Sequence, residues 1–260
     1  MKIGLQTYTI RKSIKTLEGF DKAMAEVSEA GIKYLEIAAD YLKFPFDETN
    51  SLRMKEILDK YGIEAVSCQI RQKRVESDFD TVYKAFKALD VNNITNSLMD
   101  LRCLKDGEKG VVAYCESLEK YRLKMEANGL FVAHHHHHYE CLRLGDKTIL
   151  EIMAENFGGG FVLDTYWLAR GGIDPVGLIM RLTDRVRIMH IRDYKLKLSL
   201  LGLRPTDTEI GRGNLDFSYI LFKAAKYGVE YGMIEQNTKN ELESVKISAA
   251  NAFAAIGRIS

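Results

Sequence analysis

Short apolar runs alternate with longer amphipathic stretches along almost the whole sequence. The runs are brief and apolar on both faces, which suits the buried strands of a parallel sheet. We predict eight such strands, at residues 3–6, 34–37, 65–68, 93–95, 131–133, 161–164, 186–190 and 232–235. The stretches between them predict eight helices, at 17–29, 52–61, 79–89, 109–128, 148–156, 175–182, 217–227 and 241–255.

A glycine recurs where a predicted helix ends and the next apolar run begins. It occurs at Gly31, Gly62, Gly129 and Gly228, and each is followed by isoleucine, leucine or valine. Glycine suits the position after a helix because a positive φ carries no Cβ penalty there. The intervals of 31, 67 and 99 residues are close to multiples of about 33, the length of one strand-helix unit. Residues 1–260 are therefore predicted to form one α/β domain, a single (β/α)8 TIM barrel.

The composition is that of an ordinary globular protein, with 46% hydrophobic and 28% charged residues. There are 37 Lys and Arg residues against 36 Asp and Glu, so the net charge is +1. This balance, without a block of like charges, argues against binding to nucleic acid or an anionic membrane. Four sparse cysteines, no export signal and no long apolar run predict reduced thiols and a cytoplasmic protein.

Residues with ligand or acid-base chemistry stand at the ends of several predicted strands. They are Glu36, the run His134 to His138, Asp164, His190 and Glu235. In a TIM barrel these strand ends meet at one rim, where the working residues of such enzymes lie. Carboxylates and imidazoles crowded there are costly to bury unless a cation lies between them. The pattern therefore predicts a divalent metal site.

The histidine run is open to two interpretations. It is internal and so unlike an affinity tag, but it could be a solvated polar loop. If it continues a strand, His135 and His137 share one face, and the other three histidines point the opposite way. Trp167 could stack on a sugar or simply pack against its neighbours. Glu36 could act in the site or form an ion pair with a helix lysine.

Taken together, the strand-end motifs resemble those of a known family. The segments that carry the resemblance are residues 4–11, 34–37, 135–140, 163–167, 189–193, 210–217 and 234–236. In order and spacing they are similar to the xylose-isomerase-like TIM barrels, in the branch of sugar phosphate isomerase/epimerase-type proteins. The resemblance runs nearly from end to end of the chain.

The resemblance implies one divalent metal ion, such as manganese, magnesium, cobalt or zinc. By position, Asp164, His190 and Glu235 match three of its ligands. The fourth would come from residues 135–140, where the sequence departs from the pattern of the family. We expect His135 to be this ligand, with His137 and Glu140 as alternatives.

The implied activity is that of a metal-dependent sugar isomerase or epimerase. A proton next to a carbonyl would be removed and an enediolate formed. We expect Glu235 to act as the base, with Glu140 or His137 as the opposing acid. Arg192, Trp167 and Glu36 are expected to bind a small sugar or keto-sugar.

Other functions remain open on the sequence. A keto-sugar dehydratase or lyase would share the enediolate step, and a non-catalytic sugar-binding barrel is the alternative from another class. An endonuclease IV-like nuclease is less favoured, since five of the six histidines stand in one run and cannot supply three zinc ions. A homo-oligomer is also possible.

Overall fold

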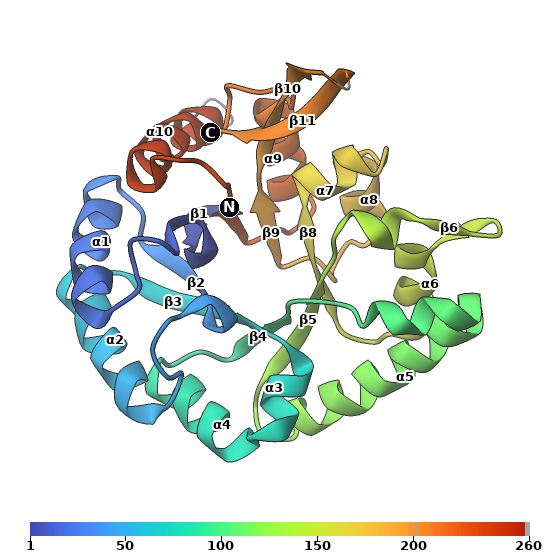
Figure 1. Ribbon diagram of the computed structural model, residues 1–260, viewed down its shortest axis with the longest axis horizontal. Coiled ribbons are helices and arrows are strands. Elements are labelled where there is room, and N and C mark those ends of the chain that lie inside the picture. Colours follow the sequence, from blue (N-terminus) through green and yellow to red (C-terminus); the bar gives the residue numbers. More distant parts are fainter. Residues whose placement is uncertain (201, 258–260) are drawn as a thin grey trace.

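All eight predicted strands are present in the computed structural model, which describes residues 1–200 and 202–257. They pair in parallel and close into one barrel, confirming the predicted (β/α)8 fold class (Figure 1). In barrel order the strands are β1 (Lys2–Gln6), β12 (Tyr231–Ile234), β9 (Ile188–Ile191), β8 (Gly160–Asp164), β5 (Phe131–His135), β4 (Asn93–Asn96), β3 (Glu64–Ile70) and β2 (Tyr34–Ala38).

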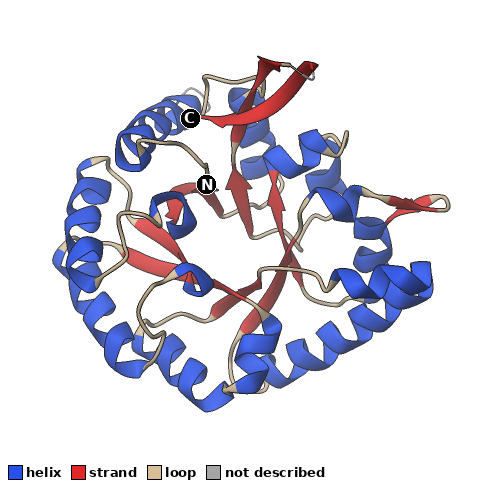
Figure 2. Ribbon diagram, viewed as in Figure 1, coloured by secondary structure: helices blue, strands red, loops and turns tan. Residues whose placement is uncertain are grey.

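The eight predicted helices are also present, and helices surround the barrel (Figure 2). They are α1 (Leu17–Glu29), α2 (Glu48–Lys60), α4 (Phe79–Ala88), α5 (Gly107–Glu126), α6 (Ile149–Asn156), α8 (Pro175–Arg181), α9 (Phe217–Lys226) and α10 (Glu241–Gly257). The sequence analysis missed two short helices that follow β3 and β8, namely α3 (Gln72–Ser77) and α7 (Thr165–Arg170). Short 3-10 helices lie at η1 (Thr7–Ile10), η2 (Ala39–Tyr41), η3 (Leu101–Asp106) and η4 (His138–Cys141).

Two antiparallel hairpins interrupt the alternation, and neither was predicted. The smaller one joins β6 (Arg143–Leu144) to β7 (Lys147–Thr148). The larger one joins β10 (Asp193–Ser199) to β11 (Gly202–Thr208) and stands off the barrel in Figure 1. Most of its side chains are exposed, so it lacks the continuous apolar signal of the barrel strands.

The glycines at the helix ends have the predicted backbone conformation. Gly62 follows α2 with a φ of +64°, and Gly31, Gly129 and Gly228 also have positive φ. A Cβ added to Gly62 would meet no heavy atom within 4 Å. Glycine is therefore required at this position because of the backbone conformation and not because space is lacking.

The interior of the barrel changes from apolar to polar along the strand direction. An apolar layer inside it consists of Val66, Val162, Ile188, Tyr231 and Met233. Alternate residues of a strand point to the same face, so a step of two residues reaches the next inward position. From Val162 this step leads to Asp164, and from Ile188 to His190. The strands thus carry a polar layer on top of an apolar one.

Two further expectations concern the cysteines and the apolar character of the helices. All four cysteines are free thiols, as expected. Within the described residues, no helix has the length and apolar character needed to span a membrane.

We predict that Gly62→Ala lowers the free energy of unfolding by about 1–2 kcal/mol, the cost of forcing an alanine into left-handed backbone. Gly62→Asn should lose less, because asparagine tolerates this conformation better. Denaturant unfolding of both variants provides the measurement. Equal stability of wild type and both variants would contradict this account of the helix end.

Candidate metal centre

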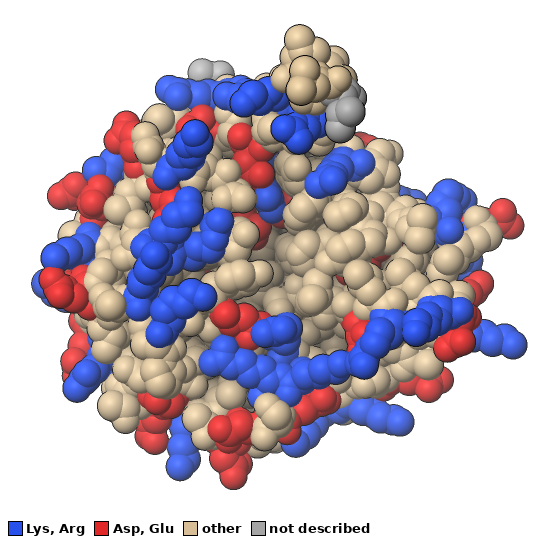
Figure 3. Space-filling view, viewed as in Figure 1, with Lys and Arg blue, Asp and Glu red and all other residues tan. Residues whose placement is uncertain are grey.

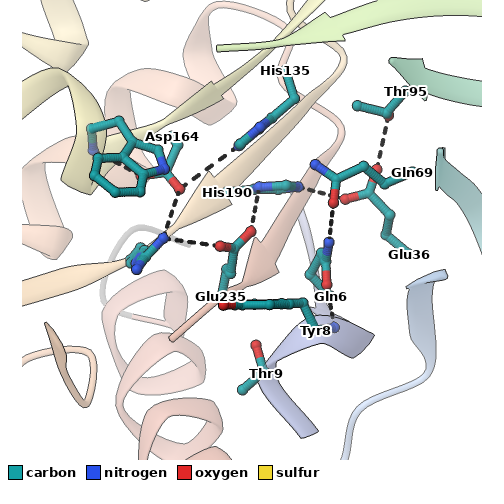
Figure 4. A network of polar contacts seen from close by, with 12 residues as sticks. Gln6, Tyr8, Thr9, Glu36, Gln69, Thr95, His135, Asp164, His190 and Glu235 are labelled. Atoms are coloured by element: carbon teal, nitrogen blue, oxygen red, sulfur yellow. Dashed lines mark hydrogen bonds and ion pairs between the residues drawn. The ribbon is translucent and has the colours of Figure 1, made fainter. Parts of the chain in front are cut away.

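Four side chains with nitrogen or oxygen ligand atoms meet in the polar layer (Figure 4). His135 ends β5, Asp164 ends β8, His190 lies in β9, and Glu235 directly follows β12. These strands are consecutive in the barrel. One ligand atom from each residue lies within 4.8 Å of the others, and all four residues are buried. The structure thus brings together the four residues that the sequence analysis expected to hold a metal.

Several of these ligand atoms have no hydrogen-bond partner among the described residues. They include both ring nitrogens of His135 and Oδ2 of Asp164, which lies 3.9 Å from His135 Nε2. Buried polar atoms without partners cost free energy, and a divalent cation would supply a partner to each of them. A donor set of two imidazoles and two carboxylates suits zinc, cobalt or manganese better than magnesium, which prefers oxygen ligands. The residues present therefore fit the expected ion.

The two imidazoles of the group have opposite electrostatic surroundings. Burial lowers the pKa of His135 well below its ordinary value, so this ring is neutral and can offer a lone pair. Burial also disfavours the charged form of His190, but the carboxylates of Glu36 and Glu235 raise its pKa to about 10. A proton on His190 Nδ1 then faces Glu235 Oε2, 2.9 Å away. A divalent cation would compete with this proton.

Arg192 connects Glu235 to the β10–β11 hairpin. Its Nη1 donates to Glu235 Oε1 at 3.0 Å, while Nε and Nη2 donate to Asp207 at 2.5 and 3.1 Å. Burial by itself would raise the pKa of Glu235, but His190 and Arg192 lower it below its ordinary range. Arg192, expected to bind substrate, lines the pocket with its guanidinium held by two carboxylates.

Asp164 is held in place by backbone contacts on both sides. Its Oδ1 accepts a hydrogen bond from the N–H of Trp167 at 3.0 Å and so caps α7. Its own N–H donates to Nε2 of His136 at 3.0 Å. These contacts leave Oδ2 directed at the cluster, 3.8 Å from Arg192 Nη1. Burial raises the pKa of this carboxyl.

The histidine run alternates between two environments, as predicted for a strand that continues into it. His135 and His137 line a pocket above the polar layer. His134 turns the other way and contacts the Asn96 amide at 3.2 Å, and His136 holds Asp164. Burial lowers the pKa of His137 to about 3, so its ring is neutral at neutral pH.

Glu140 lies outside the pocket, although the sequence analysis expected it to act on substrate or metal. The single turn of η4 directs its fully buried carboxylate back to the strand. Its Oε2 accepts a hydrogen bond from the N–H of His137 at 2.9 Å, and Oε1 lies 3.3 Å from His134 Nε2. Through these contacts Glu140 stabilises the conformation of the histidine segment.

Glu36 is also placed differently from the expectation that it binds substrate. It is fully buried beneath the pocket and does not line it. Its side chain contacts His190 and Thr95 instead (Figure 4), and also Ser67. The reason is that β2 continues to Ala38, so Glu36 lies two residues below the strand end.

The pocket above the four residues has a volume of about 410 Å³, within the range of small-molecule sites. Figure 3 shows a hollow near the barrel axis on the face viewed in Figure 1. Trp167 lines the pocket, as expected. The sequence analysis missed other lining residues, namely Tyr8, Asp40, Tyr41, Gln69, Arg71, Ser97, Leu98 and Asn237. All of them lie at or just after strand ends, but polar loop residues are too common for that position alone to identify them.

No protein-family model and no curated protein matches the sequence. Solved structures do match. A sugar phosphate isomerase/epimerase from Parabacteroides distasonis superposes with a TM-score of 0.78 and 21% identity, over 98% of this chain and 95% of the other. A probable 3-DHS dehydratase from Bacillus anthracis superposes with a TM-score of 0.72 and 13% identity, over 96% of this chain and 98% of the other.

A third structure is a xylose isomerase-like TIM barrel protein from Mycobacterium smegmatis in complex with magnesium. It superposes with a TM-score of 0.71 and 11% identity, over 100% of this chain and 98% of the other. These matches cover nearly the whole length of both chains in every pair. The chain therefore has the fold of the sugar phosphate isomerase/epimerase and xylose isomerase-like TIM barrels.

Proposed function

We propose that the protein is a divalent-metal-dependent isomerase or epimerase of a sugar or a related carbonyl compound. The observation that carries the proposal is the group of His135, Asp164, His190 and Glu235 beneath a pocket of small-molecule size. Packing alone gives no reason to bury ligand atoms without hydrogen-bond partners, whereas a cation would give each of them a partner. The fold similarity is consistent with this activity.

His135, Asp164, His190 and Glu235 would hold the ion. When bound, a divalent ion supplies Lewis-acid polarisation of a carbonyl and neutralises negative charge that develops on substrate oxygens. Such neutralisation favours removal of a proton from the carbon next to a carbonyl. This step is common to the isomerisation and epimerisation of sugars.

Two pocket residues have the protonation states that proton transfer needs. Glu235 is ionised, because His190 and Arg192 lower its pKa, and so it can accept a proton. His137 is neutral and has no partner for its Nδ1 among the described residues, so it can accept a proton from a substrate hydroxyl and return it. We assign the removal of the proton next to the carbonyl to Glu235 and the transfer of the hydroxyl proton to His137.

The other pocket residues would position the substrate. Trp167 lines the pocket, where its indole would contact a sugar ring, and the Arg192 guanidinium carbon lies 4.9 Å from its ring centre. Arg192 holds Glu235 and so keeps the base in place.

Dehydration of a keto-sugar is the second candidate function. It starts with the same proton removal and then requires a proton for the departing hydroxyl. The proton that Glu235 takes from carbon can then pass to the departing hydroxyl, which leaves as water. A substrate mass reduced by one water would distinguish this reaction from isomerisation.

We predict that the purified protein carries about one divalent ion per chain and that Asp164→Asn loses it, because the amide is a poorer ligand. Asparagine can still cap α7, so the fold should persist. Elemental analysis of both proteins measures this, with Asp216→Asn, a cap of α9, as the control. Full metal retention by Asp164→Asn would remove Asp164 from the ligand set.

The two pocket histidines should separate metal binding from proton transfer. His135→Gln should lower metal content, because it removes a ligand. His137→Gln should retain the ion but slow turnover by about 10²- to 10⁴-fold, the usual effect of a general acid or base. His138→Gln, at a less buried position, is the matched control. Equal, negligible effects of all three would mean that the run does not serve the site.

Glu235→Gln tests the base. With a panel of keto-sugars in deuterated water, deuterium uptake next to the carbonyl should fall by about 10²- to 10⁴-fold. The metal content of the same sample must be measured, since glutamine is also a poorer ligand. A variant that retains metal and exchanges at the wild-type rate would exclude Glu235 as the base. Metal binding without exchange in the wild type would favour a non-catalytic sugar-binding barrel.

A further inference from the structure

Glu36 and His190 form a buried pair across the barrel interior. Glu36 comes from β2 and His190 from β9, and both are fully buried. Glu36 Oε2 lies 2.5 Å from His190 Nε2, and Oε1 accepts a hydrogen bond from the Thr95 hydroxyl at 2.8 Å (Figure 4). Oε1 also accepts a hydrogen bond from the Ser67 hydroxyl at 2.8 Å. Every polar atom of the Glu36 side chain is thus engaged below the pocket.

These contacts determine which nitrogen of His190 carries the shared proton. The two hydroxyls donate to Oε1, so Glu36 serves as an acceptor there. An oxygen that accepts from two hydroxyls is expected of an ionised carboxylate, which can only accept hydrogen bonds. The contact at Oε2 is therefore made by an N–H of the ring, which places a proton on Nε2 of His190.

The opposite side of the His190 ring faces the candidate metal centre. Its Nδ1 lies 2.9 Å from Glu235 Oε2 but has no contact with hydrogen-bond geometry among the described residues. We propose that Glu36 is a positioning residue, which keeps a proton on Nε2 of His190 and directs Nδ1 at the metal. This inference rests on the proposed function. A carboxylate behind a ligating histidine orients the ring and makes it a better ligand.

The two ring nitrogens of His190 have different surroundings. Nε2 is engaged by Glu36, whereas Nδ1 meets, within the described part of the chain, only the Glu235 carboxylate, at 2.9 Å and without hydrogen-bond geometry. Because both hydroxyls occupy Oε1 of Glu36, its Oε2 is left to the ring. This arrangement is expected if Glu36 fixes the direction of His190 and leaves Nδ1 to a cation.

Zinc affinity provides the test, measured by competition with a chromophoric chelator. Glu36→Gln keeps the shape but removes the charge, and we expect zinc to bind about 10- to 100-fold more weakly. Ser67→Ala, which removes one donor to Glu36, should show a smaller loss. Glu230→Gln, which removes a carboxylate paired with Arg187 before β12, controls for the change in net charge. It should bind zinc like the wild type.

A second measurement needs no variant of Glu36. In the zinc-loaded wild type, nitrogen NMR should show His190 protonated at Nε2 and metal-bound at Nδ1, with His190→Gln used to assign the signals. Metal on Nε2 would overturn the inference. The inference would also be overturned if the wild type binds zinc and folded Glu36→Gln binds it with the same affinity. Absence of zinc binding in the wild type would overturn the proposed function first, and this inference with it.

Discussion

Closure of the barrel is the constraint on which the candidate site depends. Strand β1 pairs in parallel with β12, with Leu5 opposite Ile234, and this pairing joins the first strand of the barrel to its last. Only in a closed sheet do the inward positions of distant strands face one another. In this way Glu36 and His190, which are 154 positions apart in the sequence, come into contact. Closure also excludes water, which strengthens every charge interaction inside.

The buried charges of the site form a connected set. Arg192 is shared by Asp207 and Glu235, and His190 by Glu36 and Glu235. Glu235 therefore belongs to both pairs and couples the hairpin to the barrel interior. Buried carboxylates require such partners, because an isolated charge is very costly to desolvate. A divalent ion would add positive charge where Asp164 and Glu235 approach each other.

The barrel and a metal site at its rim could be predicted from local pattern, because short apolar runs end in polar residues and parallel strand ends share one rim. The choice of ligands rested on the family resemblance, which matched Asp164, His190 and Glu235 by position and left His137 and Glu140 as alternatives to His135. The depth of Glu36 could not be predicted, because it depends on how far β2 extends, and the pairing of β2 with β3 shifts register between Leu35 and Glu36. The orientation of Glu140 depends on the turn of η4. The Arg192–Asp207 pair depends on a hairpin whose exposed strands carry little apolar signal.

The ligand atoms come from four strands and from positions spread over residues 135 to 235, so an unfolded chain holds no preformed site. An ion that binds the closed barrel alone shifts the folding equilibrium toward it. At a free concentration 100-fold above its dissociation constant, such an ion adds about 2.7 kcal/mol to the free energy of unfolding. Occupancy of the site and the melting temperature of the barrel would then rise and fall together, so the free metal concentration would change the fraction of chains that are folded.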